Sequence, residues 1–184
     1  MNHPLPVNVY LPAGQFHFGG GDVRVHTLLG SCVAITMWHP IQRVGGICHY
    51  LLPVRGSHSG NEGVAPGMYA EEAMILFADA LRRAHTLPRE YIVKIAGGGN
   101  MFPDQIVPHG CLEGTCTSER RAGCQIVGCK NIWVARELLA AAGYTVAAEN
   151  VGGEGSRKVI LDLATGDVWV RRSAALASAF VVAA

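Results

Sequence analysis

Charged residues are scarce in this sequence, and neither sign predominates. Lys, Arg, Asp and Glu make up 16% of the 184 residues, and 15 basic residues against 14 acidic ones give a formal net charge of +1. No run of basic residues occurs either. Attraction of nucleic acid or of an anionic membrane surface needs a marked excess of positive charge. We therefore expect no nucleic-acid partner.

Long hydrophobic runs are also missing. The longest late apolar stretch, residues 174–184, is shorter than the roughly 20 residues that cross a bilayer. Residues 1–6 do not show a basic segment followed by an apolar core, which is the pattern of a secretory signal. We expect a cytoplasmic protein without membrane insertion, whose six cysteines are mostly reduced.

The composition points to a globular domain with many loops. Hydrophobic residues make up 49% of the chain, and 23 residues are glycine. Disorder is not expected at this hydrophobicity, and the length suits one domain with a sizeable core. We find no internal repeat and no linker, so residues 1–184 are expected to form a single domain.

Short segments rich in β-branched and aromatic residues, bounded by Gly, Pro or Asp, predict strands. They cover residues 7–11, 23–27, 33–38, 44–52, 92–96, 144–148, 158–163 and 168–171. The last two segments flank Ala164-Thr165-Gly166-Asp167, in which the glycine would supply the positive φ of a hairpin turn.

Two segments predict helices. Residues 69–84 place apolar side chains at three- and four-residue steps, with Glu71 and Glu72 in the first turn. A second helix is expected over residues 131–142, with Asn131 as its N-cap and Gly143 in the C′ position. The fold class expected is α/β (α+β), a layered sandwich with a mixed, largely antiparallel sheet and helices packed outside.

Cys32 and His49 are the candidate catalytic pair, because each lies beside a glycine-marked turn at a strand-like run. A thiol with a pKa of ~8.5 is mostly protonated at neutral pH, and an adjacent imidazole can convert it into a nucleophile. Gly30 and Ser31 are small residues that leave room for a substrate beside Cys32. The backbone N–H groups of this segment could donate hydrogen bonds to an oxyanion. The alternatives are a buried inert cysteine and a structural histidine.

Two neighbouring features have simpler interpretations. Cys48 is next to His49, but consecutive strand residues point to opposite faces, so Cys48 is expected in the core. The segment Gly97-Gly98-Gly99-Asn100 lacks both the Rossmann spacing and the Lys-Ser/Thr ending of a phosphate loop. We expect its glycines to let the backbone approach the site closely, with Asn100 as a substrate-binding or structural hydrogen-bonding residue.

Four segments resemble the CheD family of chemoreceptor glutamine deamidases, and the resemblance extends over most of the chain. These segments are Gly30-Ser31-Cys32 with the following strand and Trp38-His39-Pro40, Gly45-Gly46-Ile47-Cys48-His49-Tyr50-Leu51-Leu52-Pro53, Lys94-Ile95-Ala96-Gly97-Gly98-Gly99-Asn100-Met101-Phe102, and Val151-Gly152-Gly153 with Gly155 and Arg157-Lys158.

The resemblance implies roles for three residues. Cys32 would be the nucleophile, His49 its base and proton carrier, and Thr27 the third member of a triad. The residue six positions before Cys32 is His26 and the threonine lies five before it, so the alternation of Thr27 relative to Cys32 stays open. The implied fold is a layered α/β sandwich related to the catalytic domain of cytotoxic necrotizing factor toxins, which also deamidate glutamine.

The implied activity converts glutamine to glutamate, with release of ammonia, in the cytoplasmic helices of methyl-accepting chemotaxis receptors. The same acyl chemistry would extend to glutamate methyl esters, and it requires no metal or organic cofactor. The alternative function is that of a non-catalytic chemotaxis regulator, which binds receptors or a CheC-like phosphatase.

An irregular, cysteine-rich insertion covers about residues 103–130. Cys111, Cys116, Cys124 and Cys129 are separated by four, seven and four residues. Four thiols at such short separations could enclose tetrahedral Zn²⁺, although the spacing differs from the usual Cys-x2-Cys pairs. The favoured interpretation is a set of reduced loop thiols, and a zinc site or a thiol redox module is the alternative.

Overall fold

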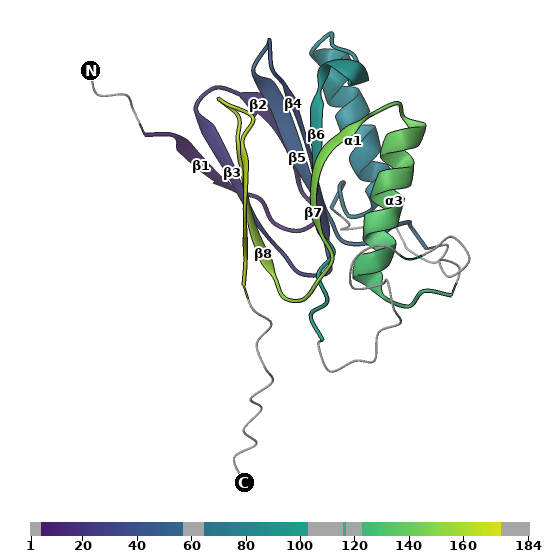
Figure 1. The fold of residues 1–184 in the computed structure, drawn as a ribbon. Coiled ribbons are helices and arrows are strands. Elements are labelled where there is room, and N and C mark those ends of the chain that lie inside the picture. The colour runs from purple at the N-terminus through teal and green to yellow at the C-terminus, as the bar shows by residue number, and fades with distance from the viewer. Residues whose placement is uncertain (1–4, 57–64, 103–115, 117–122, 174–184) are drawn as a thin grey trace.

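The computed structural model describes residues 5–56, 65–102, 116 and 123–173. They build three layers, which are a pair of helices, a five-stranded sheet and a four-stranded sheet (Figure 1). The helices lie on the outside of the five-stranded sheet, and the second sheet covers its other face. This confirms the expected fold class, and the predicted strands are divided between two sheets.

The five-stranded sheet has the order β2-β5-β4-β6-β7. Its strands are β2 (Phe16–Gly20), β4 (Val33–His39), β5 (Val44–Tyr50), β6 (Ile92–Gly97) and β7 (Val146–Val151). All pairs are antiparallel except β6 with β7. The central strands β4 and β5 are buried on both faces, which explains their nearly continuous apolar sequences. The sequence did not predict β2, which contains two glycines.

The four-stranded sheet has the order β1-β3-β8-β9. Its strands are β1 (Val7–Tyr10), β3 (Val23–Leu29), β8 (Arg157–Asp162) and β9 (Val168–Arg172). In β3, Val25, Thr27 and Leu29 are buried, whereas Leu28 is exposed. This alternation identifies the face of β3 that packs against the five-stranded sheet.

The helices are α1 (Ala70–Arg83) and α3 (Val127–Ala141), with a short 3-10 turn η1 (Pro88–Glu90). Both predicted helices are confirmed, and Gly143 follows α3 with a positive φ of 79°. The predicted N-cap of the second helix is wrong. The helix begins at Val127 after the N-cap Ile126, and Asn131 lies fully buried inside it. The side-chain amide of Asn131 donates hydrogen bonds to the segments just before β4 and just after β5 instead of capping its own helix.

The β8–β9 hairpin joins the two sheets. Gly166 has a φ of 77°, and a Cβ there would lie 2.2 Å from the ring of Trp38, so both the turn and the packing require glycine. The Nε1 of Trp38 donates to the carbonyl of Leu163 at 2.9 Å. The Nζ of Lys94 donates to the carbonyl of Gly166 at 3.0 Å. Both donors belong to the five-stranded sheet, and both acceptors belong to the hairpin.

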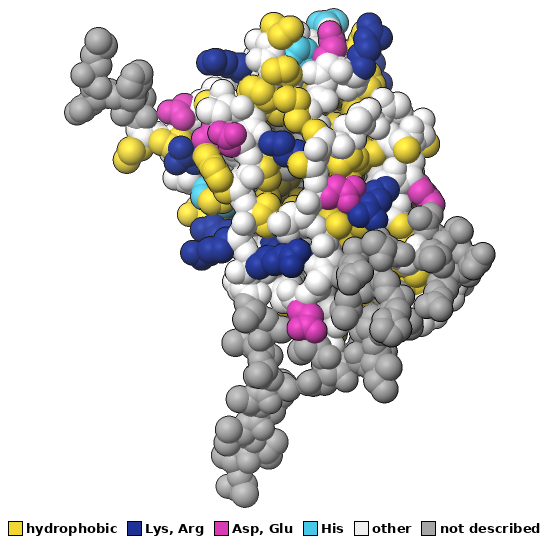
Figure 2. All heavy atoms as spheres, viewed as in Figure 1, with side chains coloured by type: hydrophobic (Ala, Val, Ile, Leu, Met, Phe, Trp, Pro, Cys, Tyr) yellow, Lys and Arg dark blue, Asp and Glu magenta, His cyan; other side chains and the backbone are white. Residues whose placement is uncertain are grey.

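The face of the molecule seen in Figure 2 carries basic and acidic side chains interspersed with hydrophobic and neutral ones. This mixed surface agrees with the near-neutral formal charge. In the part of the chain that the structure describes, no helix is long and apolar enough to cross a membrane.

Candidate active site

Cys32 and His49 lie on the same face of the five-stranded sheet. The register pairs Ala34 with His49, and Cys32 is two residues before Ala34, so the two side chains are diagonal neighbours on adjacent strands. Ala34 belongs to the core between the two sheets, and the partly buried Cys32 packs against that core. Cys48 is fully buried in the other core, beneath the helices, which confirms that it points away from His49.

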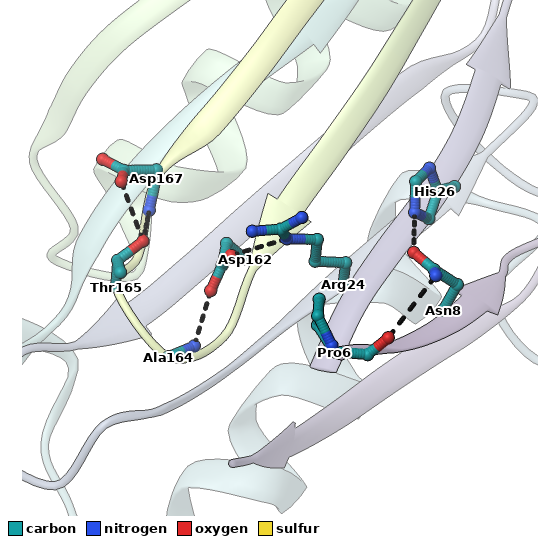
Figure 3. A network of polar contacts seen from close by, with 8 residues as sticks. All are labelled: Pro6, Asn8, Arg24, His26, Asp162, Ala164, Thr165 and Asp167. Carbon is teal, nitrogen blue, oxygen red and sulfur yellow. Dashed lines mark hydrogen bonds and ion pairs between the residues drawn. The ribbon is translucent and has the colours of Figure 1, made fainter. Parts of the chain in front are cut away.

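Thr27 joins this pair from the opposite sheet. Its Oγ1 lies 2.8 Å from the Nδ1 of His49, and both side chains are buried. His26, the residue before Thr27 on β3, lies on the opposite face, where its Nε2 is 2.7 Å from the Oδ1 of Asn8 (Figure 3). The sequence left open which face of the strand Thr27 occupies. In the structure Thr27, and not His26, lies beside His49.

The hydrogen bonds of Thr27 determine the tautomer of His49. Its Oγ1 donates to the carbonyl oxygen of Leu11 at 2.8 Å, and a carbonyl can only accept. Because the hydroxyl has one proton, the Oγ1 must accept a hydrogen bond from the Nδ1–H of His49. The neutral ring then has a lone pair on Nε2, the atom that can act as a base.

The Nε2 of His49 is buried, and it has no hydrogen-bond partner among the residues that the structure describes. Burial lowers the pKa of His49 from 6.5 to about 4, so the ring is neutral at pH 7. Burial also raises the pKa of the Cys32 thiol, against a smaller lowering by its own backbone N–H. The resting pair is therefore a thiol and a neutral imidazole, and not a thiolate with an imidazolium.

The glycine-rich loop after β6 packs directly on the segment that carries Cys32. The N–H of Gly98 donates to the carbonyl of Cys32 at 2.7 Å, and the N–H of Gly99 donates to that of Gly30 at 2.8 Å. Gly97 has a φ of 120°, and a Cβ there would lie 2.2 Å from the carbonyl oxygen of Cys32. The prediction that these glycines permit a close backbone approach is confirmed.

Asn131 supports the same segment from helix α3. Its Nδ2 donates to the carbonyl of Ser31 at 3.0 Å and to that of Leu51 at 2.7 Å. The carbonyl oxygens of Gly30, Ser31 and Cys32 thus all accept hydrogen bonds from other parts of the chain. The sequence does not predict this role. Its signal is an asparagine within the apolar helical segment, and the residue type favours a cap.

Asn100 has a structural position in the turn after the glycines. Its Oδ1 accepts from the N–H of Phe102 at 3.0 Å, and its Nδ2 donates to the carbonyl of Phe102 at 3.2 Å. Its backbone N–H donates to Gly153 and its carbonyl accepts from Gly155. The structural alternative for Asn100 is therefore observed, and its substrate-binding role stays a prediction.

Arg157 holds the neighbouring turn. It is fully buried, and its Nε donates to the Oδ1 of Asn150 at 2.9 Å while its Nη2 donates to the carbonyl of Gly152. Burial and the nearby Arg172 lower its pKa to about 10, which leaves the guanidinium charged at pH 7. The segments that carry the family resemblance thus meet around the segment Gly30-Ser31-Cys32.

A separate cavity of about 290 Å³ lies between β6, β7 and β9 and is lined by residues that include Thr36, Lys94 and Asn150. Cys32, His49 and Thr27 do not line it.

Of the four cysteines in the insertion, three come together. The sulfur atoms of Cys116, Cys124 and Cys129 lie within 4.8 Å of one another, and all three residues are buried. Cys111, the fourth member of the predicted set, lies outside the described residues.

Comparisons with known proteins identify relatives of this chain. A family model described as CheD chemotactic sensory transduction matches residues 51–172, a segment that begins after His49. A protein of Dechloromonas aromatica described as probable chemoreceptor glutamine deamidase CheD 3 is 40% identical over 162 residues, covering 88% of this chain and 85% of that protein. A protein of Pseudomonas savastanoi pv. phaseolicola described as probable chemoreceptor glutamine deamidase CheD is 41% identical over 174 residues, covering 93% and 88%.

Among solved structures, the chain is similar to Bacillus licheniformis hypothetical protein YfiH. The TM-score is 0.46 at 14% sequence identity, and the match covers 76% of this chain and 51% of that one.

Proposed function

This chain belongs to the CheD family, and from that premise we propose that it is a protein-glutamine deamidase acting on the cytoplasmic helices of methyl-accepting chemotaxis receptors. Cys32 is the nucleophile, His49 the base and proton carrier, and Thr27 the residue that positions the imidazole. The observation that carries this proposal is the hydrogen bond between Thr27 and the Nδ1 of His49, which leaves a buried Nε2 lone pair on the face occupied by Cys32.

The first half of the reaction forms a thioester. As the Sγ of Cys32 attacks the carboxamide carbon of a receptor glutamine, its proton passes to the Nε2 of His49. The tetrahedral intermediate then collapses, the C–N bond breaks, and the imidazolium gives its proton to the leaving nitrogen, which departs as ammonia. Because the resting pair is neutral, proton transfer accompanies the attack, as in serine hydrolases.

The second half hydrolyses the thioester. The neutral imidazole takes a proton from water while the water oxygen attacks the acyl carbon. The C–S bond breaks, the sulfur recovers the proton, and the product is glutamate. A glutamate methyl ester would pass through the same thioester with methanol as the leaving group, so methylesterase activity is part of the proposal.

Backbone N–H groups at Ser31 and Cys32 are our candidates for the oxyanion donors. In a trans peptide, the N–H points away from the carbonyl of the preceding residue. The carbonyls of Gly30 and Ser31 are directed at Gly99 and Asn131, so the following N–H groups point away from those partners. The effect of the Cys32 N–H on the pKa of its own thiol agrees with a donor near the reacting sulfur.

The surroundings of Cys32 suit a protein substrate. Met101 packs against Gly30, and the side chains of Met101 and Phe102 are 40% and 66% exposed. Exposed apolar side chains beside a reactive residue are typical of a contact surface for another protein. A receptor helix would place its glutamine over Cys32 while its apolar residues cover these two side chains.

The proposal is tested by incubating the protein with a purified cytoplasmic fragment of a chemoreceptor from the same cell. We expect release of ammonia and a matching glutamine-to-glutamate mass change at defined positions. A fragment whose glutamines at those positions are replaced by glutamate is the control, and it should release no ammonia. Binding of the fragment without any conversion would contradict the proposal and favour the non-catalytic regulator.

A further inference from the structure

We propose that Cys116, Cys124 and Cys129 bind a zinc ion that secures the start of helix α3. Their sulfur atoms lie within 4.8 Å of one another, and all three side chains are buried. Cys124 precedes α3, Cys129 lies in its first turn, and Cys116 comes from the preceding segment. Chain segments that are separate in sequence thus bring three soft ligands to one point.

The geometry is close to that of a zinc–thiolate site. A tetrahedral ion with Zn–S bonds of about 2.3 Å has sulfur atoms separated by about 3.8 Å. The three sulfur atoms are at most 4.8 Å apart, so a contraction of no more than about 1 Å would form one face of the tetrahedron. Small rotations about the χ1 angles of three cysteines can provide that change.

A purely hydrophobic role for the three thiols explains the cluster less well. The three thiols form a cluster apart from the two main cores, and among the residues that the structure describes the partly buried apolar residues packed against it are Ile126 and Trp133, of which Trp133 also contacts the core beneath the helices. A thiol is a small apolar group, and burial stabilises by roughly 25 cal/mol per Å². Burial of three thiols therefore offsets little of the conformational entropy lost in fixing the cysteines themselves. Metal coordination would supply that free energy directly.

The start of α3 favours thiolate ligands. No acidic residue lies in its first turn, and the N-cap Ile126 makes no side-chain capping hydrogen bond. The first N–H groups of a helix have no intrahelical acceptor and carry a partial positive charge. A negatively charged thiolate sulfur at Cys129 would lie in this favourable field.

The zinc ion would act on the active site through α3. Gly128 packs on the glycine-rich loop, where a Cβ would lie 2.6 Å from the carbonyl oxygen of Gly98. Asn131, two residues after Cys129, donates to the carbonyl of Ser31. Fixing the first turn of α3 therefore fixes the donors that hold the Cys32 segment. The zinc is structural, and it takes no part in the thioester chemistry.

The test uses the full chain purified under reducing conditions. We expect stoichiometric zinc by mass spectrometry of the metal, and replacement by Co²⁺ should give intense thiolate-to-cobalt charge-transfer absorption with the d–d bands of a tetrahedral ion. Cys124→Ser and Cys129→Ser should lose the metal, whereas Cys32→Ala, the matched control in the catalytic site, should keep it.

Two results would overturn the zinc proposal. One is wild-type protein that contains no stoichiometric metal and gives no cobalt absorption after reconstitution. The other is a folded Cys124→Ser or Cys129→Ser variant, by circular dichroism, that binds the metal as tightly as the wild type. If both serine variants unfold, the wild-type cobalt spectrum decides. Failure of the zinc proposal would not contradict the proposed deamidase activity. The Cys32→Ala variant is expected to bind the metal but to form no glutamate, so metal content and glutamine conversion are tested separately.

Discussion

Asn131 on helix α3 donates its side-chain amide to the carbonyl oxygen of Ser31 at 3.0 Å, across 100 residues of sequence. The same nitrogen donates to Leu51, so one buried side chain links the segments before β4 and after β5. Cys32 lies in the first of these segments, and His49 lies in β5, two residues before Leu51. The helix layer thereby holds the two strands of the candidate site in register.

Asn131→Asp is expected to destabilise the protein and to loosen the Cys32 segment. The carboxylate keeps the shape of the amide but cannot donate, so each of the two buried carbonyls would lose its donor at a cost of about 1–3 kcal/mol. Urea unfolding should show the loss, and alkylation of Cys32 by iodoacetamide should become faster. Lys130→Ala, on the adjacent helix position, is the control, and an equal effect of the two changes would refute the role of Asn131.

Thr27→Val should lower kcat for deamidation without preventing folding. Valine is nearly the same size, but the Nδ1–H of His49 loses its acceptor, and the neutral ring can then carry its proton on Nε2. We expect kcat to fall by at least about tenfold, and by no more than the roughly 10²–10⁴-fold that a positioned general base contributes in total. Thr27→Ser retains the hydroxyl and should retain most of the activity. A fully active Thr27→Val protein would be evidence against positioning by this hydroxyl.

His49 should make the folded state less stable in acid. Its pKa is lowered from 6.5 to about 4 by burial, so the folded state binds fewer protons than the unfolded state between these values. The stabilising contribution is complete above pH 6.5 and is lost as the pH falls towards 4, by about 3 kcal/mol.

The measurement is the free energy of unfolding in urea from pH 7 to pH 4, for the wild type and for His49→Gln. His17 and His26, whose pKa values are also lowered by burial, are present in both proteins, so their effects cancel in the difference. The wild type should lose about 3 kcal/mol more than the variant over this range. Parallel curves would show that His49 is not buried in its neutral form.

Gly97→Ala should disturb the active site far more than Gly143→Ala. Both glycines have a positive φ, at 120° and 79°, so alanine is strained at either position. At Gly143 no heavy atom lies within 4 Å of the added Cβ, whereas at Gly97 the Cβ would meet the carbonyl oxygen of Cys32 at 2.2 Å. The difference in kcat between the variants, measured on the receptor fragment, isolates that contact. Equal kcat values would mean that the glycine loop does not position Cys32.

Local sequence patterns predicted most of the elements and the opposite orientations of Cys48 and His49. Alternation in strands and the spacing of apolar residues in helices depend on neighbours in the chain, so they can be read from short segments. The glycine loop beside Cys32 was also anticipated, because a run of glycines without phosphate-loop spacing favours a close backbone approach.

The features that escaped prediction depend on contacts distant in sequence. The division of the strands into two sheets decides that Thr27 faces His49, and no local pattern specifies which sheet a strand joins. Asn131 fits an N-cap by residue type, but its donors are used by Ser31 and Leu51. Strand β2 was missed because its glycines resemble a loop, although pairing with β5 holds it in the sheet.

Conversion of receptor glutamine by Cys32→Ala, compared with Cys48→Ala, tests the proposed nucleophile most directly. Both variants lose one thiol, but the partly buried Cys32 lies on the face shared with His49, whereas Cys48 is fully buried in the core beneath the helices. We predict that Cys32→Ala binds the receptor fragment and forms no glutamate, while folded Cys48→Ala converts it. Conversion by Cys32→Ala at the wild-type rate would contradict the account.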